Sequence, residues 1–177
     1  MARSSKSQDS TRPAPRLRRA YYDCRYGQLH LHNAIPAGGG FDELTSVICV
    51  HDAGETGRVF MPLLPILGLA RSVYALDMPG AGESDPAPGE TALDAAANVV
   101  TDFVDSMRIR AFDLVVRGAA APVAARLLET HAAAVRRVVL LAAVPEQRGG
   151  PRVTSLSPVD SARTDLAARL VDLLGAA

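Results

Sequence analysis

The hydrophobic positions along the chain fall into short apolar runs that are separated by longer segments of helical periodicity. The apolar runs have little internal alternation, which is typical of strands buried on both faces of a parallel sheet. They cover residues 47–50, 72–76, 112–116 and 137–142. An alternating segment ahead of them, residues 21–32 with a turn at Gly27-Gln28, predicts a β-hairpin.

Helices are predicted between and after these strands. Apolar residues recur at helical spacing in three segments: 60–67, 93–104 and 123–128. Thr91 and Asp94 form a capping box at the start of the second of these segments. After Pro145 the pattern predicts turns and one more helix, residues 160–175, with no further strand.

This order of elements predicts an α/β fold. Strands that alternate with helices are joined by right-handed crossovers and form a parallel sheet with helices on both faces. We therefore expect a three-layer αβα domain with a mostly parallel sheet. In such sheets ligands bind at the carboxyl ends of the strands, which places a candidate site in the turns that follow the predicted strands.

Length, composition and charge narrow the possible functions. The chain has 177 residues, the size of one domain, and 48% of them are hydrophobic, enough for a globular core. Lys+Arg and Asp+Glu both number 19, whereas a protein that mainly binds nucleic acid is normally basic. No apolar run reaches the roughly 18 residues of a membrane-spanning helix. Cys24 and Cys49 are too few for a disulfide scaffold or a zinc cluster. From the charge, the apolar runs and the cysteines together, we expect no metal, no cofactor and no nucleic-acid or membrane partner.

The first 19 residues differ in composition from the rest of the chain. They contain mostly Ser, Thr, Pro and Arg, and apart from Met1 the only large aliphatic residue is Leu17. Such a segment cannot bury enough apolar surface to offset the entropy of ordering, so residues 1–19 are predicted to be a disordered basic arm and residues 20–177 the folded domain. The arm also resembles a transit peptide but lacks the apolar face, and no secretory signal is visible, so we expect a cytoplasmic protein.

Four segments in order resemble the N-terminal part of an α/β-hydrolase, over roughly residues 21–145. The first is a strand that ends in His51, followed by a Gly-containing turn. The second, residues 77–85, reads D-x-P-G-x-G-x-S-D and is the most specific. The others are residues 112–115, which lead into a sharp turn and a helix, and residues 131–137, which lead into the next strand. The resemblance implies a mostly parallel sheet whose strand-to-helix turns carry a Ser-His-Asp triad and an oxyanion hole.

The nucleophile position departs from that family. The family carries its serine on a G-x-S-x-G elbow, a strained strand-to-helix turn that lifts the hydroxyl into the pocket. Here the stretch reads Val116-Arg117-Gly118-Ala119-Ala120, so the serine position is Gly118 and both elbow glycines are replaced. Because glycine also tolerates strained geometry, we expect the turn to be kept and the nucleophile to be lost.

The general base of the triad is missing as well. The family places its acid and its histidine after later strands, but no histidine follows Pro145. The four histidines are His30, His32, His51 and His131. We expect His30 and His32 to be solvated on the hairpin and His131 to lie on the surface. The resemblance implies a structural role for His51 beside the oxyanion loop.

Asp52 is unusual at the mouth of the predicted pocket. The resemblance implies that Asp52, Ala53 and Ala119 belong to the oxyanion region, where backbone N–H groups stabilise developing negative charge. A carboxylate at Asp52 would repel such charge. We expect it to pair with Arg117 across the mouth of the pocket and to fill the vacated site.

Three hypotheses on function remain open at this stage. The first is a truncated, degenerate α/β-hydrolase homologue without Ser-His-Asp activity that binds a small apolar ligand or a protein partner. The second is an enzyme with altered chemistry, of lyase or isomerase type, that uses His51, Asp52 and Arg117; a buried Asp beside an imidazole can shuttle a proton. The third is a truncated reading frame that keeps a closing helix similar to that of the family.

The missing strands also predict a partner. Residues 137–142 would form an apolar edge strand with little protection by charge, and such an edge invites pairing with another chain. We therefore expect a homodimer through this edge, unless the helix at 160–175 covers it.

Overall fold

A computed structural model describes residues 12–39, 44–142, 152–156 and 163–175 of the chain. In this part of the chain seven strands form one sheet in the order β1-β2-β4-β3-β5-β6-β7. Strand β2 pairs with β1 and β4 in antiparallel fashion, and all other pairs are parallel. The mostly parallel sheet of the sequence prediction is confirmed.

The elements have the following bounds. The strands are β1 (Arg16–Cys24), β2 (Gly27–Ile35), β3 (Ser46–Val50), β4 (Val73–Leu76), β5 (Phe112–Arg117), β6 (Val135–Leu141) and β7 (Val153–Leu156). The α-helices are α1 (Leu64–Leu67), α2 (Ala92–Ser106), α3 (Ala121–Thr130) and α4 (Arg163–Leu174). Two short 3₁₀ helices are η1 (Gly57–Phe60) and η2 (Gly118–Ala120).

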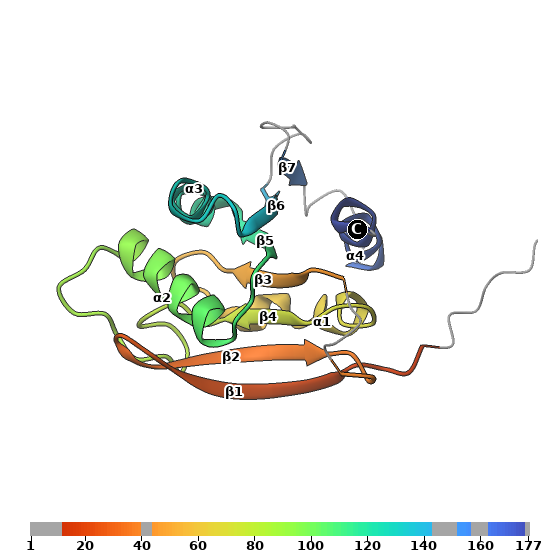
Figure 1. Ribbon diagram of the computed structural model, residues 1–177, viewed down its shortest axis with the longest axis horizontal. Helices are drawn as coiled ribbons and strands as arrows, with labels where there is room; N and C mark the ends of the chain where they lie inside the picture. The colour runs from red at the N-terminus through yellow and green to blue at the C-terminus, as the bar shows by residue number, and fades with distance from the viewer. Residues whose placement is uncertain (1–11, 40–43, 143–151, 157–162, 176–177) are drawn as a thin grey trace, which may run out of the picture.

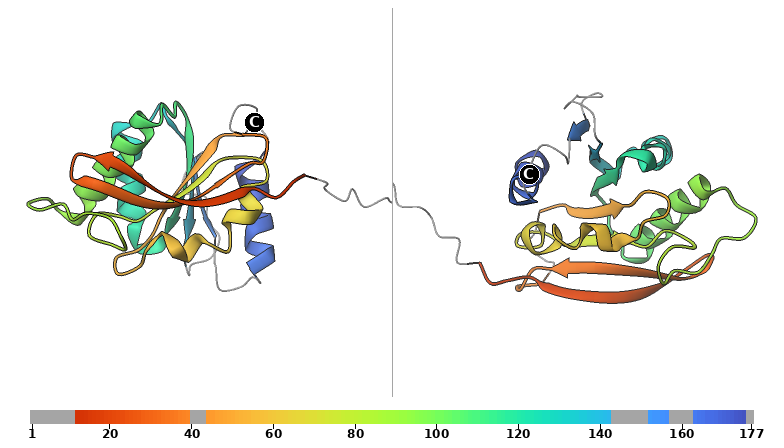
Figure 2. Two further views of the ribbon diagram at one scale, coloured as in Figure 1. Left: turned by 90° about the horizontal axis from the view of Figure 1, so that it is seen from below. Right: turned by 180° about the vertical axis from the view of Figure 1, so that it is seen from behind.

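Helices cover both faces of the sheet. Figure 1 shows α2 and α3 on one side and α1 and α4 on the other, and the views from below and behind in Figure 2 agree. The buried residues form two clusters that match these layers: one packs Phe103 of α2 against Leu114 of β5, and the other packs Leu170 of α4 and Leu64 of α1 against the opposite face. The predicted three-layer αβα architecture is therefore confirmed.

The predicted boundary between arm and domain is wrong. Strand β1 begins at Arg16, within the segment that was assigned to the arm, and Arg16 pairs with Ile35 of β2. Residues 16–19 keep their side chains exposed, so they belong to the sheet through backbone pairing alone. Hydrophobic patterning detects burial, and this part of the strand has none. Residues 1–11 lie outside the described residues.

The predicted free edge at residues 137–142 is wrong as well. Strand β7 pairs with β6 in parallel, with Val138 opposite Val153 and Leu141 opposite Leu156, so β6 is an interior strand. The homodimer through β6 therefore loses its basis. Hydrophobic patterning does not reveal β7, because the strand has four residues and only Leu156 is buried. The predicted last helix is confirmed as α4, which covers one face of the sheet.

Arginine side chains fix the C-terminal end of α4 to the base of the sheet. A register shift between Phe112 and Asp113 makes a bulge in the β5–β6 pairing. The bulge lets Arg136 and Arg137, which are neighbours in the chain, both donate to the carbonyl of Leu174. The last carbonyls of a helix have no partners within it, so these bonds satisfy acceptors that would otherwise be lost.

Candidate functional site

A cavity of about 350 Å³ opens at the carboxyl ends of β3, β4 and β5. It lies where the sequence predicted a site, and Asp52, Ala53 and Ala119 all line it. The remaining walls are mostly apolar and come from the turns after β3 and β4 and from α2 and α3: Val50, His51, Gly54, Met78, Pro79, Gly80, Ala81, Ala92, Leu93, Ala96, Ala120, Pro122 and Val123.

His51 is held on both sides of its ring. The side chain is buried, its Nδ1 lies 2.7 Å from the carbonyl oxygen of Asp52, and its Nε2 accepts the backbone N–H of Met78 at 2.9 Å. An Nε2 that accepts and an Nδ1 that donates define the neutral Nδ1–H tautomer. The imidazole therefore ties the turn after β3 to the turn after β4, and neither nitrogen is free to take a proton from a ligand.

Asp52 does not pair with Arg117, so that expectation is wrong. The Oδ1 atom of Asp52 accepts the backbone N–H of Ala120 at 2.9 Å. Helix α3 has no side-chain cap of its own at its first turn, and the carboxylate supplies a partner for the exposed N-terminal dipole.

Arg117 instead pairs with Glu55, a residue that the sequence analysis did not single out. The guanidinium makes a bidentate contact, with Nη2 at 2.8 Å from Oε1 and Nε at 3.1 Å from Oε2. Glu55 Oε2 also accepts the backbone N–H of Asp52 at 3.2 Å. The one hint in the sequence was the position of Glu55 in the Gly-containing turn after β3. Arg117 does not line the cavity.

The strained elbow that Gly118 was expected to keep is absent. Gly118 is not among the described residues with positive φ, and it begins the regular 3₁₀ turn η2. A Cβ atom built on Gly118 would lie 3.3 Å from the Cβ of Ala142, at the end of β6. Gly118 is also not among the residues that line the cavity. A Cβ at this position would therefore lie against the end of β6.

Two backbone N–H groups at the cavity donate to carboxylates of the protein itself. Glu55 occupies the N–H of Asp52, and Asp52 occupies the N–H of Ala120. Backbone N–H groups in this region are what an oxyanion hole uses. With two of them bonded to carboxylates, the site is poorly suited to a ligand that carries or develops negative charge.

The expectation that His30 and His32 are solvated is wrong. His30 is 2% exposed, and its Nδ1 lies 2.8 Å from Oδ2 of Asp77. The Asp77 carboxylate also accepts the backbone N–H of Gly57 at 2.6 Å and that of Glu83 at 3.3 Å. Asp77, the first residue of the D-x-P-G-x-G-x-S-D segment, thus joins the hairpin to the turns after β3 and β4. His131 is half-buried after the end of α3, and its Nδ1 lies 2.8 Å from the hydroxyl of Thr130.

The described residues offer neither a thiol nucleophile at the cavity nor a metal site. Cys49 is fully buried, does not line the cavity, and its burial raises the pKa of the thiol. No group of three or more His, Cys, Asp or Glu side chains in the described part of the chain could hold a metal ion. Within the same residues, every helix is too short or too polar to cross a membrane.

Comparison with known proteins agrees with this fold. A family model described as alpha/beta hydrolase fold matches residues 45–173. The chain therefore belongs to the α/β hydrolase fold family. No match was found among curated proteins.

Several solved structures are similar in fold. An epoxide hydrolase from an endophytic Streptomyces has a TM-score of 0.60 and 22% identity, over 71% of this chain and 37% of its own. Wild-type Cfl2 from Burkholderia cenocepacia has a TM-score of 0.62 and 20% identity, over 81% and 47%. Naproxen esterase from Bacillus subtilis has a TM-score of 0.61 and 19% identity, over 73% and 44%. The chain thus spans less than half the length of each of these proteins.

Proposed function

We propose that this chain is a member of the α/β hydrolase fold family that binds a small, uncharged, apolar ligand without Ser-His-Asp hydrolysis. The observation that carries the proposal is the turn at Gly118, which holds no nucleophile, does not line the cavity and places its Cβ position against Ala142. The apolar lining and the volume of about 350 Å³ fit a small ligand. The carboxylates of Asp52 and Glu55 on the nearby N–H groups favour a neutral ligand over an anion.

An enzyme that uses His51, Asp52 and Arg117 together is less well supported. Both ring nitrogens of His51 have partners, and Arg117 forms its ion pair with Glu55 outside the cavity lining. Asp52 would have to act alone, with one oxygen already bonded to the N–H of Ala120. Ligand binding requires none of these bonds to break.

We expect Gly118→Ser to remain without esterase activity. The new hydroxyl would face the end of β6, where a Cβ already lies 3.3 Å from Ala142, and no free imidazole stands beside it. The assay is release of p-nitrophenol from p-nitrophenyl acetate and butyrate, with the unchanged protein as control. A burst or a turnover above that control would contradict both the geometry at Gly118 and the proposal.

We expect Ala119→Phe to abolish binding of a neutral apolar ligand. Ala119 lines the cavity but is exposed, so the larger side chain can fill the space without disturbing the core. Binding is measured by calorimetric titration with p-nitrophenyl butyrate, which is neutral and, on this proposal, is not hydrolysed.

The matched control for this experiment is Ala125→Phe. Ala125 is exposed on α3 and does not line the cavity, so this variant should bind the probe as the unchanged protein does. Equal binding by all three proteins would place the ligand elsewhere and overturn the assignment of the cavity. Absence of binding by the unchanged protein would reject the proposed function.

A further inference from the structure

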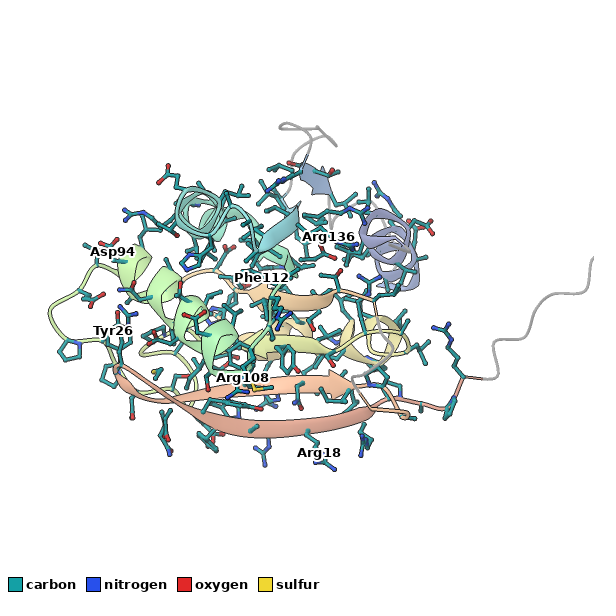
Figure 3. All side chains as sticks on the ribbon, in the orientation of Figure 1. Arg18, Tyr26, Asp94, Arg108, Phe112 and Arg136 are labelled. Atoms are coloured by element: carbon teal, nitrogen blue, oxygen red, sulfur yellow. The ribbon has the colours of Figure 1, made fainter. Side chains whose placement is uncertain are left out.

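A second cavity, of about 400 Å³, shares no lining residue with the first and lies between the N-terminal hairpin and the segment that contains η1 and α1. Arginines dominate its charged lining, with Arg18 and Arg19 from β1 and Arg58 from η1. No acidic side chain is among the residues that line it. Figure 3 labels Arg18 on β1, the outermost strand of the sheet.

The positive charge at this cavity is only partly balanced. Arg19 lies 3.8 Å from Glu83, and both side chains are largely exposed, so this pair is weak. Arg58 makes no ion pair with any residue in the described part of the chain. An anion that enters the cavity would therefore meet three guanidinium groups, and within the described part of the chain Arg19 is the one of them that lies within 4 Å of a carboxylate.

A buried imidazole also lines the cavity. His32 is 7% exposed, and its Nε2 is buried without a hydrogen-bond partner. Burial lowers the pKa of His32, and the charges of His30, Arg58 and Arg19 lower it further, while Asp77 acts in the opposite direction. The ring packs edge-on against His30 at a centroid distance of 5.0 Å. Buried polar atoms without partners are rare in native proteins, and this one belongs to a residue that lines the cavity.

Apolar side chains form the rest of the wall. Leu17 is 45% exposed and Met61 is 37% exposed, and Leu64 is buried beneath them. Leu17 and Met61 are among the few large hydrophobic residues exposed on the described part of the surface. Guanidinium groups beside exposed apolar side chains suit a ligand with one anionic end and one apolar end.

We propose that this second cavity binds a carboxylate with an apolar tail, held by Arg58 and Arg19 at its charged end and by Leu17 and Met61 along its tail. A carboxylate suits the planar, forked donors of arginine. The proposal does not depend on the function proposed for the first cavity, because no residue lines both.

The test uses the full chain at low salt and octanoate as the probe, with calorimetric titration and the imidazole signals of His32 in nuclear magnetic resonance as readouts. We expect octanoate to bind and to shift the His32 signals. Octanol and octylammonium, which share the tail, should bind at least about tenfold more weakly, because each lacks the charge-assisted bonds to arginine.

Variants place the ligand within the molecule. Arg58→Gln should weaken octanoate binding by about tenfold, the usual consequence of losing one such bond. Arg110→Gln is the matched control, since Arg110 is exposed ahead of β5 and lines neither cavity. Ala119→Phe, which fills the first cavity, should leave octanoate binding unchanged.

Three results would overturn the proposal. The first is no binding of octanoate by the unchanged protein. The second is an equal loss of affinity in Arg58→Gln and Arg110→Gln, which would indicate nonspecific attraction to arginine. The third is loss of binding in Ala119→Phe with retention in Arg58→Gln, which would place the carboxylate in the first cavity.

Discussion

Asp113→Asn is expected to lower the free energy of unfolding by about 3–5 kcal/mol, the usual effect of removing one partner of a buried ion pair. Asp113 has no solvent exposure, although it lies near the start of a strand in the middle of the sheet. Its carboxylate meets two arginines, with Arg136 Nη2 at 2.8 Å and Arg71 Nη1 at 3.4 Å from Oδ2. Without the negative charge, the buried guanidinium of Arg71 and the partly exposed guanidinium of Arg136 both lose their anionic partner.

The two arginines depend on Asp113 to different degrees. Burial lowers the pKa of Arg71, whose side chain is 2% exposed, and the charge of Asp113 partly offsets this. The hydrogen bond that Arg136 donates to Asp113 raises the pKa of Arg136, which is partly exposed between β6 and α4 (Figure 3). Arg71 also donates to the carbonyl of Gly175 and Arg136 to that of Leu174. Loss of the carboxylate should therefore loosen the end of α4 as well.

The measurement is denaturant unfolding monitored by circular dichroism. Asp102→Asn is the matched control, because Asp102 also forms a bidentate pair, with Arg25, but both side chains keep access to solvent, at 19% for Asp102 and 45% for Arg25. That variant should lose at most about 1 kcal/mol. Similar losses in the two variants would show that burial of Asp113 does not decide its contribution.

Gly82→Ala is expected to destabilise the protein by roughly 3–5 kcal/mol, from left-handed backbone strain together with damage to a buried carboxylate network. Gly82 has a φ of 56°, and a Cβ there would lie 1.9 Å from Oδ2 of Asp77. The carboxylate would have to move, and its contact with His30 and its bond from the N–H of Gly57 would break. This is the physical reason for the second glycine in the D-x-P-G-x-G-x-S-D segment.

Gly89→Ala separates the effect of left-handed backbone strain from the effect of a steric clash with Asp77. Gly89 also has positive φ, at 84°, but nothing lies within 4 Å of a Cβ at that position. We expect it to lose about 1 kcal/mol in the same unfolding experiment. Equal stability of Gly82→Ala and Gly89→Ala would show that the clash with Asp77 does not contribute to the free energy of unfolding. The proposed reason for a glycine at position 82 would then be wrong.

The candidate site was predictable in position but not in its bonds. The apolar runs at β3, β4 and β5 placed a site in the turns after them, and the resemblance to the α/β-hydrolases named Asp52, Ala53 and Ala119, all of which line one cavity. The partners were predicted incorrectly, because Asp52 and Glu55 both lie in the turn after β3 and either carboxylate could reach Arg117. The structure assigns Glu55 to Arg117 and Asp52 to the start of α3. Which carboxylate pairs with Arg117 depends on differences of a few ångströms in position. Hydrophobic periodicity contains no information on such differences.

The buried histidines show the same limit. His30 and His32 alternate with leucines in β2, and alternation on a hairpin predicts that one face is solvated. Segments far away in the chain cover that face, with Asp77 against His30 and the η1–α1 segment beside His32. Whether a strand is covered on its second face depends on tertiary packing, so the two histidines could not be placed from their own neighbourhood.

By itself the sequence determined the three-layer fold, the order of the helices and central strands, and the presence of glycine at position 118, where the resemblance implies a serine, because hydrophobic period and residue identity are local properties. Only the tertiary structure decided that β7 covers β6, that the turn at Gly118 is unstrained, and that a bulge at Asp113 lets Arg136 and Arg137 reach the same helix end. These features depend on contacts between segments distant in the chain. Such contacts are set by the packing of the whole domain.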